Sequence, residues 1–217
     1  MLAATDIDAV FSYAGRTRAP VSQPLPTRIG GFGGAAGLAA YLRAEGMTHV
    51  VDATHPFAAQ ISRNAAEACA AAGVALLALE RPAWTEGPGD RWQRVADLAA
   101  ACSALPTDPT QVFLAIGKQH LDVFSAAPWH SYLLRLVDEP EGAVPLPNAW
   151  IVVDRGPFTA RNDQRLFETH GITHIVAKNA GGVGAEAKLI AARALGPRVI
   201  LVERPTGPER KTVATPL

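Results

Sequence analysis

The chain of 217 residues is long enough for one large domain or two small domains with hydrophobic cores. Its 20 basic and 20 acidic side chains balance, which excludes an overall field that attracts nucleic acid or an anionic membrane. No apolar run approaches the roughly 18 residues that span a bilayer, no signal peptide opens the chain, and Cys69 and Cys102 lie in Ala-rich stretches typical of reduced thiols. We therefore expect a soluble cytoplasmic protein without a metal site, a nucleic-acid partner or a membrane partner.

Strands and helices alternate in the first half of the sequence. Its apolar runs are nearly continuous, which is typical of strands that are covered on both faces. The Pro-containing segment Leu105–Thr110 is typical of a linker, so we predict one domain over residues 1–106 and another over 107–217. The expected strands of the first half are 8–13, 26–29, 48–53 and 75–79, and its expected helices are 34–45 and 57–72.

The second half repeats this alternation and adds one strand at its beginning. A loop rich in Pro follows the second of its strands. The expected strands are 111–116, 132–137, 149–154, 173–178 and 198–202, and the expected helices are 118–126, 160–169 and 184–195.

Two segments of the first half recur in the second half. Gly46–Ala53 resembles Gly171–Lys178 at an offset of 125 residues, and Leu79–Pro82 resembles Val202–Pro205 at an offset of 123. An Ala-rich helical stretch lies between the two segments of each copy, so each copy is a strand, a helix and a second parallel strand. The repeat predicts an α/β protein with two Rossmann-like parallel-sheet domains that are related by internal duplication and face a cleft.

The repeat also predicts that the first domain is incomplete at its N-terminus. Under the offset of about 124 residues, the strand Val112–Ile116, Gly117 and the helix after them have no counterpart in the first half. We therefore expect the first domain to lack its first strand and the loop after it. In doubly wound folds this loop usually carries phosphate recognition.

The loop after the first expected strand suggests how a dinucleotide is selected. An acidic residue at this place suits a free ribose 2′-hydroxyl, whereas Arg16 with Ser12 and Thr17 suits a 2′-phosphate. These residues favour NADP over NAD. The alternative is a solvated arginine in a turn.

Two further loops of the first half follow strands and precede helices. Gly31-x-Gly33-x-x-Ala36 fits a loose form of the dinucleotide fingerprint, but it follows the third strand position of the fold and not the first. A turn whose backbone lies close to a bound ligand and a plain tight turn are therefore equally good interpretations. In the segment Asp52–Phe57, Thr54 or His55 is placed to cap the next helix, and the small Ala53 leaves room for a flat ring. His55 is either a capping or buried histidine or a group that donates a proton or orients a nicotinamide.

Cations gather in the loops of the second half. The chain has only four lysines, and Lys118, Lys178 and Lys188 lie in or just after its glycine loops. Glycine and cations together form an anion nest, and their position at strand ends favours a carboxylate-bearing ligand over unrelated surface charges. The candidate anion-binding residues are Lys118, Arg155, Lys178, Asn179, Gly181 and Gly182.

Taken together, these segments resemble the precorrin-6A reductase family of cobalamin biosynthesis. The resemblance runs over nearly the whole chain in the family's order. It implies that hydride from NADPH reduces the C18–C19 double bond of the precorrin-6A macrocycle, which gives precorrin-6B without a metal. The segments that carry it are Ser12–Thr17, Gly30–Gly34, Asp52–Phe57, Glu80–Trp84, Ala115–Gln119, Arg155–Phe158 and Ala177–Gly182.

The resemblance also implies roles for the loop residues. Ser12, Arg16 and Thr17 are expected to hold the 2′-phosphate of NADPH, and Gly31, Gly33, Ala53, Thr54 and His55 to line the nicotinamide side, with His55 as the catalytic candidate. The cations and glycines of the second half are expected to hold the carboxylates of the tetrapyrrole. A monomer suffices for this chemistry, and pathway enzymes that hand over substrate are the protein partners to consider. The rival interpretation is a non-catalytic or sugar-nucleotide-binding double Rossmann protein.

Overall fold

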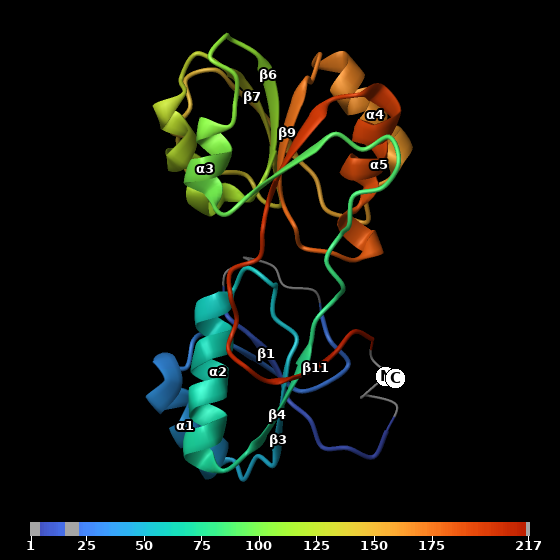
Figure 1. Cartoon of the computed structure of the whole chain (residues 1–217). Helices are drawn as coiled ribbons and strands as arrows, with labels where there is room; N and C mark the ends of the chain where they lie inside the picture. The colour runs from blue at the N-terminus through green and yellow to red at the C-terminus, as the bar shows by residue number, and fades with distance from the viewer. Residues whose placement is uncertain (1–4, 16–21, 216–217) are drawn as a thin grey trace. The chain divides into compact units, whose positions relative to one another are not determined.

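The strands of the protein form three separate sheets. The computed structural model describes residues 5–15 and 22–215 (Figure 1). The largest sheet has six strands in the order β5-β10-β9-β6-β7-β8, and each neighbouring pair is parallel. Its strands are β5 (Trp92–Val95), β6 (Gln111–Ala115), β7 (Ser131–Leu136), β8 (Ala149–Val153), β9 (His174–Lys178) and β10 (Arg198–Val202).

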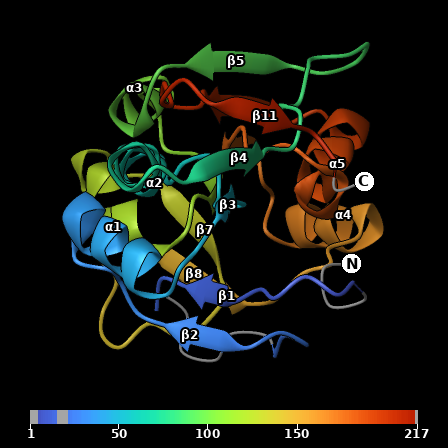
Figure 2. The same cartoon turned by 90° about the horizontal axis from the view of Figure 1, so that it is seen from below.

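The other two sheets are smaller. One pairs β1 with β2 in parallel, and the other has the order β11-β4-β3, in which β3 and β4 are parallel (Figure 2). Their strands are β1 (Phe11–Tyr13), β2 (Thr27–Ile29), β3 (His49–Asp52), β4 (Ala75–Leu79) and β11 (Lys211–Val213).

The contacts between residues divide the chain into two units. The first unit comprises Met1–Thr54, Ala58–Ala78 and Gly207–Thr212, and the second comprises His55–Phe57, Leu79–Thr206 and Val213–Leu217. The predicted boundary between residues 106 and 107 therefore lies inside the second unit. The reason is that β5, which precedes this boundary, pairs with β10 as an edge strand.

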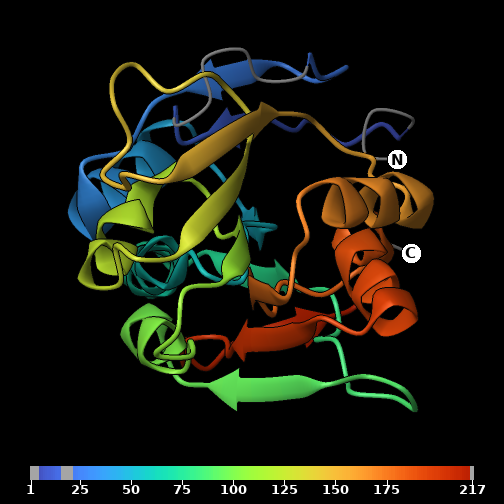
Figure 3. The same cartoon turned by 90° about the horizontal axis from the view of Figure 1, so that it is seen from above.

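The second unit has helices on both faces of its sheet. Helix α3 (Leu98–Ser103) and the 3-10 helix η2 (Lys118–Ala126) cover one face, and α4 (Ala160–Thr169) and α5 (Ala187–Leu195) cover the other (Figure 3). Alternate strand residues face opposite layers: in β7, Tyr132 and Leu134 lie in one core cluster and Leu133 in the other. This arrangement explains why the strands are apolar at nearly every position.

The strand order of the second unit is that of a Rossmann sheet. The chain runs from β6 outward to β7 and β8 and then returns to the other side of β6 with β9 and β10. The order reverses between β6 and β9, and ligands of open α/β sheets bind at the carboxyl ends of the strands beside such a reversal. The loops after β6 and β9 are therefore the first place to look for a site.

The first unit is built from small side chains. Helices α1 (Gly34–Ala44) and α2 (Ala59–Ala72) contact each other along their length. Their shared core holds Ala39, Leu42, Ala68 and Cys69, all less than 5% exposed. Alanine at these positions allows the two helix backbones to approach closely and to lie against Val50 of β3.

The predicted α/β class with parallel sheets is confirmed, and each expected strand is found within three residues of its predicted ends. Three elements were missed, namely β5, α3 and β11. The expected helix over 118–126 is a 3-10 helix with non-helical angles at His120, and the expected helix from residue 184 begins only at Ala187, after the 3-10 turn η3 (Val183–Ala185). The internal duplication, the incomplete first domain and a cleft between domains remain predictions.

No helix in the described ranges is long and apolar enough to cross a membrane.

Candidate functional site

The candidate site lies at the carboxyl end of β9, where the order of strands reverses. The chain leaves the sheet at Lys178, turns through Gly181 and Gly182 and enters η3 and then α5. Both glycines have positive φ angles, +68° and +77°, which side-chain-bearing residues rarely adopt. The loop of residues 179–185 is called the glycine loop below.

The carbonyl groups of the glycine loop are held by side chains from other parts of the second unit. Arg204 donates from Nε to the carbonyl of Asn179 at 2.8 Å and from Nη2 to that of Ala180 at 3.1 Å. The indole nitrogen of Trp84 donates to the carbonyl of Gly182 at 3.1 Å, and the ammonium of Lys188 donates to that of Ala185. The carbonyls are thus used internally, which fixes the shape of the loop.

The N–H groups on the exposed part of the glycine loop are left for a ligand. Within the described ranges, the N–H groups of Gly182, Val183 and Gly184 make no backbone hydrogen bond, and all three residues are at least partly exposed. Consecutive exposed N–H donors are able to form a concave site for an anion. The anion nest at this loop remains a prediction.

Asn179 does not face this nest. Its side-chain oxygen accepts a hydrogen bond from the backbone N–H of Trp84 at 2.8 Å, and its side-chain nitrogen donates to the Trp84 carbonyl at 3.3 Å. The residue is fully buried. Its amide therefore serves the loop's structure and is not free to bind a ligand directly.

Lys188, which the sequence also groups with the anion site, lies behind the glycine loop. It is only 5% exposed, and its ammonium lies 4.7 Å from the centre of the Trp84 ring. Burial and the nearby charge of Arg135 lower its pKa to about 8. Lys188 thus supports the loop from inside the protein.

Lys178 is the cation that the second unit places directly beside the glycine loop. Its ammonium lies 5.5 Å from the centre of the Phe57 ring, and it makes no ion pair in the described part of the chain. Partial burial lowers its pKa, since fewer water molecules solvate the charge. An incoming anion can therefore pair with this charge without displacing an acidic partner.

His55 lies in the same unit and is held as a neutral ring. Its Nδ1 accepts a hydrogen bond from the backbone N–H of Phe57 at 3.2 Å, which leaves the ring proton on Nε2. Desolvation and the charges of Arg81, Lys178, Arg204 and Lys188 lower its pKa to about 4. The expected capping role is wrong, because α2 begins at Ala59 with Ala58 as its N-cap and no side-chain cap. His55 instead presents an N–H donor.

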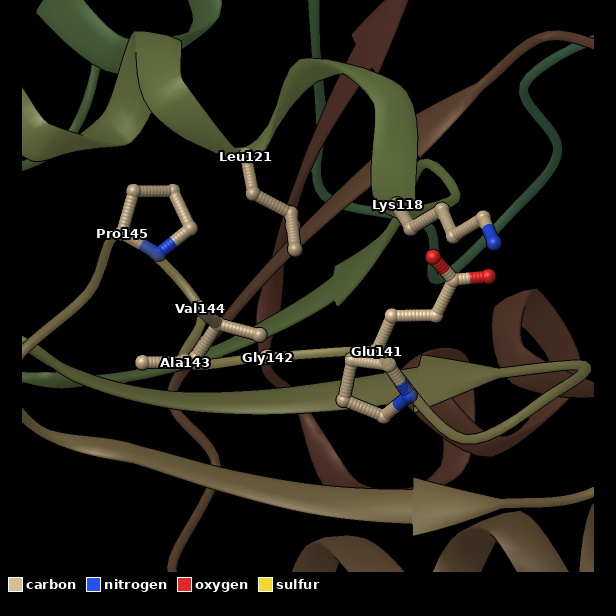
Figure 4. Close-up of a pocket in the computed structure, with 8 residues that line it drawn as sticks. Lys118, Leu121, Glu141, Gly142, Ala143, Val144 and Pro145 are labelled. Carbon is tan, nitrogen blue, oxygen red and sulfur yellow. The ribbon is translucent and has the colours of Figure 1, made fainter.

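A second possible anion contact lies after β6. Lys118 is exposed and lines a cavity of about 290 Å³ (Figure 4). Its side chain points toward the carboxylate of Glu141 across the cavity, and Leu121 and Val144 form apolar walls. The cavity combines one cation and one carboxylate with apolar walls, which suits a ligand that has both polar and apolar parts. It is lined by Lys118, Leu121, Pro140, Glu141, Gly142, Ala143, Val144 and Pro145.

Arg155 has an acidic partner already. Its guanidinium pairs with the carboxylate of Asp138 and donates from Nε to the carbonyl of Val137 at 3.2 Å. This pairing joins the loops after β7 and β8. A ligand that binds Arg155 must compete with Asp138, so Arg155 is a weaker anion site than Lys178.

In the first unit, Arg28 contacts two of the residues expected to bind the cofactor, Ser12 and Gly31. This arginine donates to the hydroxyl of Ser12 at 3.1 Å and to the carbonyl of Gly30 at 2.9 Å, and it stacks on Phe32 at 3.8 Å. It thereby joins the ends of β1 and β2. Arg16 and Thr17 lie outside the described residues.

The glycine turn before α1 is open to solvent. A Cβ at Gly31 or Gly33 would meet no atom within 4 Å, and Gly33, with φ of +80°, is the N-cap of α1. No side chain supplies a hydrogen bond at this cap. The backbone at this turn is therefore accessible to a ligand.

Thr54 and Asp52 form a tight turn after β3. Asp52 accepts hydrogen bonds from the N–H and the hydroxyl of Thr54 at 3.0 and 2.7 Å and pairs with Arg210 at 2.6 Å. Burial alone raises the pKa of Asp52, but the bonds from Thr54 and Ser62 and the charge of Arg210 lower it overall. The turn holds the exposed Ala53 and Thr54 at the end of the strand.

Comparison with known proteins gives a family. The family model described as "Precorrin-6x reductase CbiJ/CobK" matches residues 1–216. The chain belongs to this family. A precorrin-6A reductase from Rhodobacter capsulatus is 66% identical over 214 residues, which cover 99% of this chain and 85% of that protein. A precorrin-6A reductase from a Sinorhizobium species is 49% identical over 197 residues, and the match covers 91% of this chain and 76% of that protein.

A solved structure supports the same assignment. The structure titled "CobK precorrin-6A reductase" matches with a TM-score of 0.93 and 67% sequence identity, and the match covers 95% of this chain and 82% of that one. The predicted resemblance to the family of precorrin reductases is thereby confirmed, and with it the expectation that the chain is an enzyme.

In this member of the precorrin-6x reductase family, several residues around the candidate site were not predicted from the sequence. Trp84 and Arg204 shape the glycine loop, Arg28 joins Ser12 to the glycine turn, and Arg81 lies against Gly182. One available signal is the repeat, which places Arg81 and Arg204 at equivalent positions after parallel strands. Nothing in the local sequence around Trp84 or Arg28 indicates their partners.

Proposed function

We propose that the chain catalyses the NADPH-dependent reduction of the C18–C19 double bond of precorrin-6A, which gives precorrin-6B in cobalamin biosynthesis. The observation that carries the proposal is the glycine loop, a cation-lined anion site at a sheet reversal, in a chain 66% identical to a protein named precorrin-6A reductase. A macrocycle with several carboxylate arms needs scattered cations and apolar surface, and Lys178, Phe57 and the cavity beside Lys118 supply both.

The residues of the first unit suit a dinucleotide phosphate. The backbone at Gly31 and Gly33 is unobstructed, and Ser12 is exposed with its hydroxyl held by Arg28. We assign Ser12, Arg16 and Thr17 to the 2′-phosphate, and Gly31, Gly33, Ala53 and Thr54 to the rest of the cofactor, by the logic of Rossmann loops. The bound cofactor supplies the hydride. The protein's share is to position the two reactants, which contributes most of the rate.

We assign His55 the catalytic position as a neutral hydrogen-bond donor. With a pKa near 4 and Nδ1 engaged by Phe57, the ring carries its proton on Nε2 at neutral pH. A neutral imidazole orients and polarises its acceptor but is a poor proton source. The proton that completes the reduction therefore comes through water or a lysine, and His55 orients the reacting group.

We assign the second unit to the substrate. Lys178 and the N–H groups at Gly182 contact carboxylate arms, while Gly181 and Asn179 hold the glycine loop in shape. Lys118 and Arg155 are the outer cations. Both contribute less than Lys178, because Lys118 faces Glu141 and Arg155 pairs with Asp138.

The first test is the reaction itself. Wild-type protein mixed with precorrin-6A and NADPH is expected to consume NADPH and yield precorrin-6B, as followed by absorbance and mass spectrometry. Absence of NADPH consumption with folded protein would reject the proposal and leave the non-catalytic binder as the better description.

The second test separates the two ligands. Lys178→Ala is expected to raise KM for precorrin-6A about tenfold and to leave KM for NADPH unchanged, since one charge-assisted contact is lost. Lys211→Ala, at an exposed lysine of β11, is the matched control and should change neither value. Equal losses for both ligands in Lys178→Ala would assign the lysine to stability instead.

The third test concerns cofactor choice. Arg16→Ala is expected to weaken NADPH binding about tenfold and leave NADH binding unchanged, because only NADPH carries the 2′-phosphate. Dissociation constants measured by fluorescence titration give the comparison. An unchanged preference between the two cofactors would reject the role of Arg16.

A further inference from the structure

Arg81 lies across the glycine loop, and its side chain occupies the space that a side chain at Gly182 would need. A Cβ built on Gly182 would lie 2.6 Å from Cδ and 3.4 Å from Nε of Arg81. No real Cβ approaches another atom to 2.6 Å, so only glycine at position 182 lets Arg81 take this course. The arginine is exposed, and its stem passes over the part of the loop that presents free N–H groups.

Arg81 differs sharply from its repeat counterpart Arg204. The guanidinium of Arg204 donates to Glu80 at 2.9 Å, to the carbonyl of Arg81 at 2.8 Å, and to the carbonyls of Asn179 and Ala180. The guanidinium of Arg81 makes no hydrogen bond or ion pair with any described residue. The two arginines occupy equivalent positions of the repeat but differ in role. Arg204 holds the glycine loop in shape, and the guanidinium of Arg81 is available to bind a ligand.

Several cations of the second unit lie around Arg81. The positive charges of Arg81, Lys178, Arg204 and Lys188 all lower the pKa of His55. Of these cations, Arg204 pairs with Glu80 and donates to carbonyl groups, and Lys188 donates to a carbonyl group. Arg81 and Lys178 make no ion pair with any described residue, and the stem of Arg81 passes over Gly182 of the glycine loop. Unpaired cations beside exposed N–H groups favour an oxyanion as the ligand.

We propose that Arg81 is the principal carboxylate-binding residue of the glycine loop, and that Gly182 is required because its absent side chain gives Arg81 room. The identification of the anion as a carboxylate arm of the tetrapyrrole rests on the function proposed above. The planar guanidinium binds both oxygens of a carboxylate at once, whereas Lys178 supplies a single ammonium, so Arg81 gives the site its preference for carboxylate geometry.

The proposal is tested first without substrate, using citrate as the carboxylate probe and NADPH as the phosphate probe. In isothermal titration of the full chain, Arg81→Gln is expected to weaken citrate binding about tenfold and to leave NADPH binding unchanged. Arg81→Lys should recover only part of the loss. Arg161→Gln removes the same charge from an exposed position on α4 and should leave citrate binding unchanged.

The glycine requirement is tested by a double-mutant cycle. Gly182→Ala is expected to weaken citrate binding as much as Arg81→Gln does, and the double variant no further, because the alanine methyl displaces the arginine. The pKa of His55, measured by NMR, should be higher in Arg81→Gln than in wild type, because the charge of Arg81 lowers it. This measurement does not need the Gly182→Ala variant, so it tests the proposal even if that variant folds poorly.

Two results would overturn the proposal. One is unchanged citrate affinity in Arg81→Gln, and the other is a loss of NADPH affinity with citrate unaffected, which would assign Arg81 to the cofactor. Failure of the proposed function is recognised separately, by wild-type protein that binds citrate through Arg81 but does not oxidise NADPH with precorrin-6A.

Discussion

At the scale of single residues, the candidate site depends on glycines, because a Cβ atom at their positions would clash with neighbouring residues. Gly181 is buried where a Cβ would lie 2.0 Å from the carbonyl oxygen of Pro82 and 2.5 Å from Nη2 of Arg204. The backbone of the glycine loop therefore touches the segment after β4 directly. This contact brings Trp84 and Arg204 within reach of the loop's carbonyls.

Gly181→Ala is expected to destabilise the protein by about 3 kcal/mol, because it combines a positive φ angle with a clash against backbone. Urea unfolding measures the change. Gly184→Ala is the control, since a Cβ there meets nothing within 4 Å, and it should stay within about 0.5 kcal/mol of wild type. A similar small effect of both substitutions would show that the loop adapts to a side chain at position 181.

The residues that the sequence could reveal are those whose chemistry is local. Lys178, Gly181 and Gly182 could be proposed from the sequence because a lysine and glycines follow a buried strand. Arg81 was missed because its importance depends on Gly182, about a hundred residues later in the chain. Asn179 was expected to face the ligand, but Trp84, also distant in sequence, occupies its amide.

At the scale of elements, the strands with nearly continuous apolar residues were predictable because burial on both faces leaves a pattern in the sequence. β5 left no such pattern, because its two central residues, Gln93 and Arg94, are polar and exposed at the edge of the sheet. β11 is only three residues long. For α3 a signal existed, since Asp97 caps the helix by accepting from the N–H of Ala100 at 2.8 Å.

The edge strand β5 and helix α3 are expected to be necessary for the second unit to fold. A fragment of residues 79–206 contains both and should unfold cooperatively in urea. A fragment of residues 107–206 loses them together with Trp84, Ala101 and Leu105, all less than 9% exposed, and should be less stable by at least about 4 kcal/mol. Equal stability of the two fragments would contradict this role.

At the scale of the whole molecule, groups with shifted pKa values set the dependence of stability on pH. Desolvation lowers the pKa of His55, His130 and His174, so the folded protein resists protonation at these rings. The unfolded chain takes up these protons at about pH 6.5. Below that pH the unfolded state binds more protons, and stability therefore falls as the pH is lowered.

His55→Gln is expected to flatten this dependence. The variant lacks a ring whose pKa falls from 6.5 to about 4 on folding, so the urea midpoint should drop less between pH 7 and pH 5 than in wild type. The comparison within each protein cancels any difference in stability at pH 7. An equal drop in both proteins would show that His55 titrates normally in the folded state.

The sheet order β11-β4-β3 has a consequence for the way the protein is made. β4 is complete once residue 79 has been synthesised, whereas its neighbour β11 comes from residues 211–213, about 130 residues later. At common rates of synthesis the nascent chain waits roughly ten seconds between these events. During this interval one edge of β4 has no partner strand, so this is the period in which the growing polypeptide most needs protection by a chaperone.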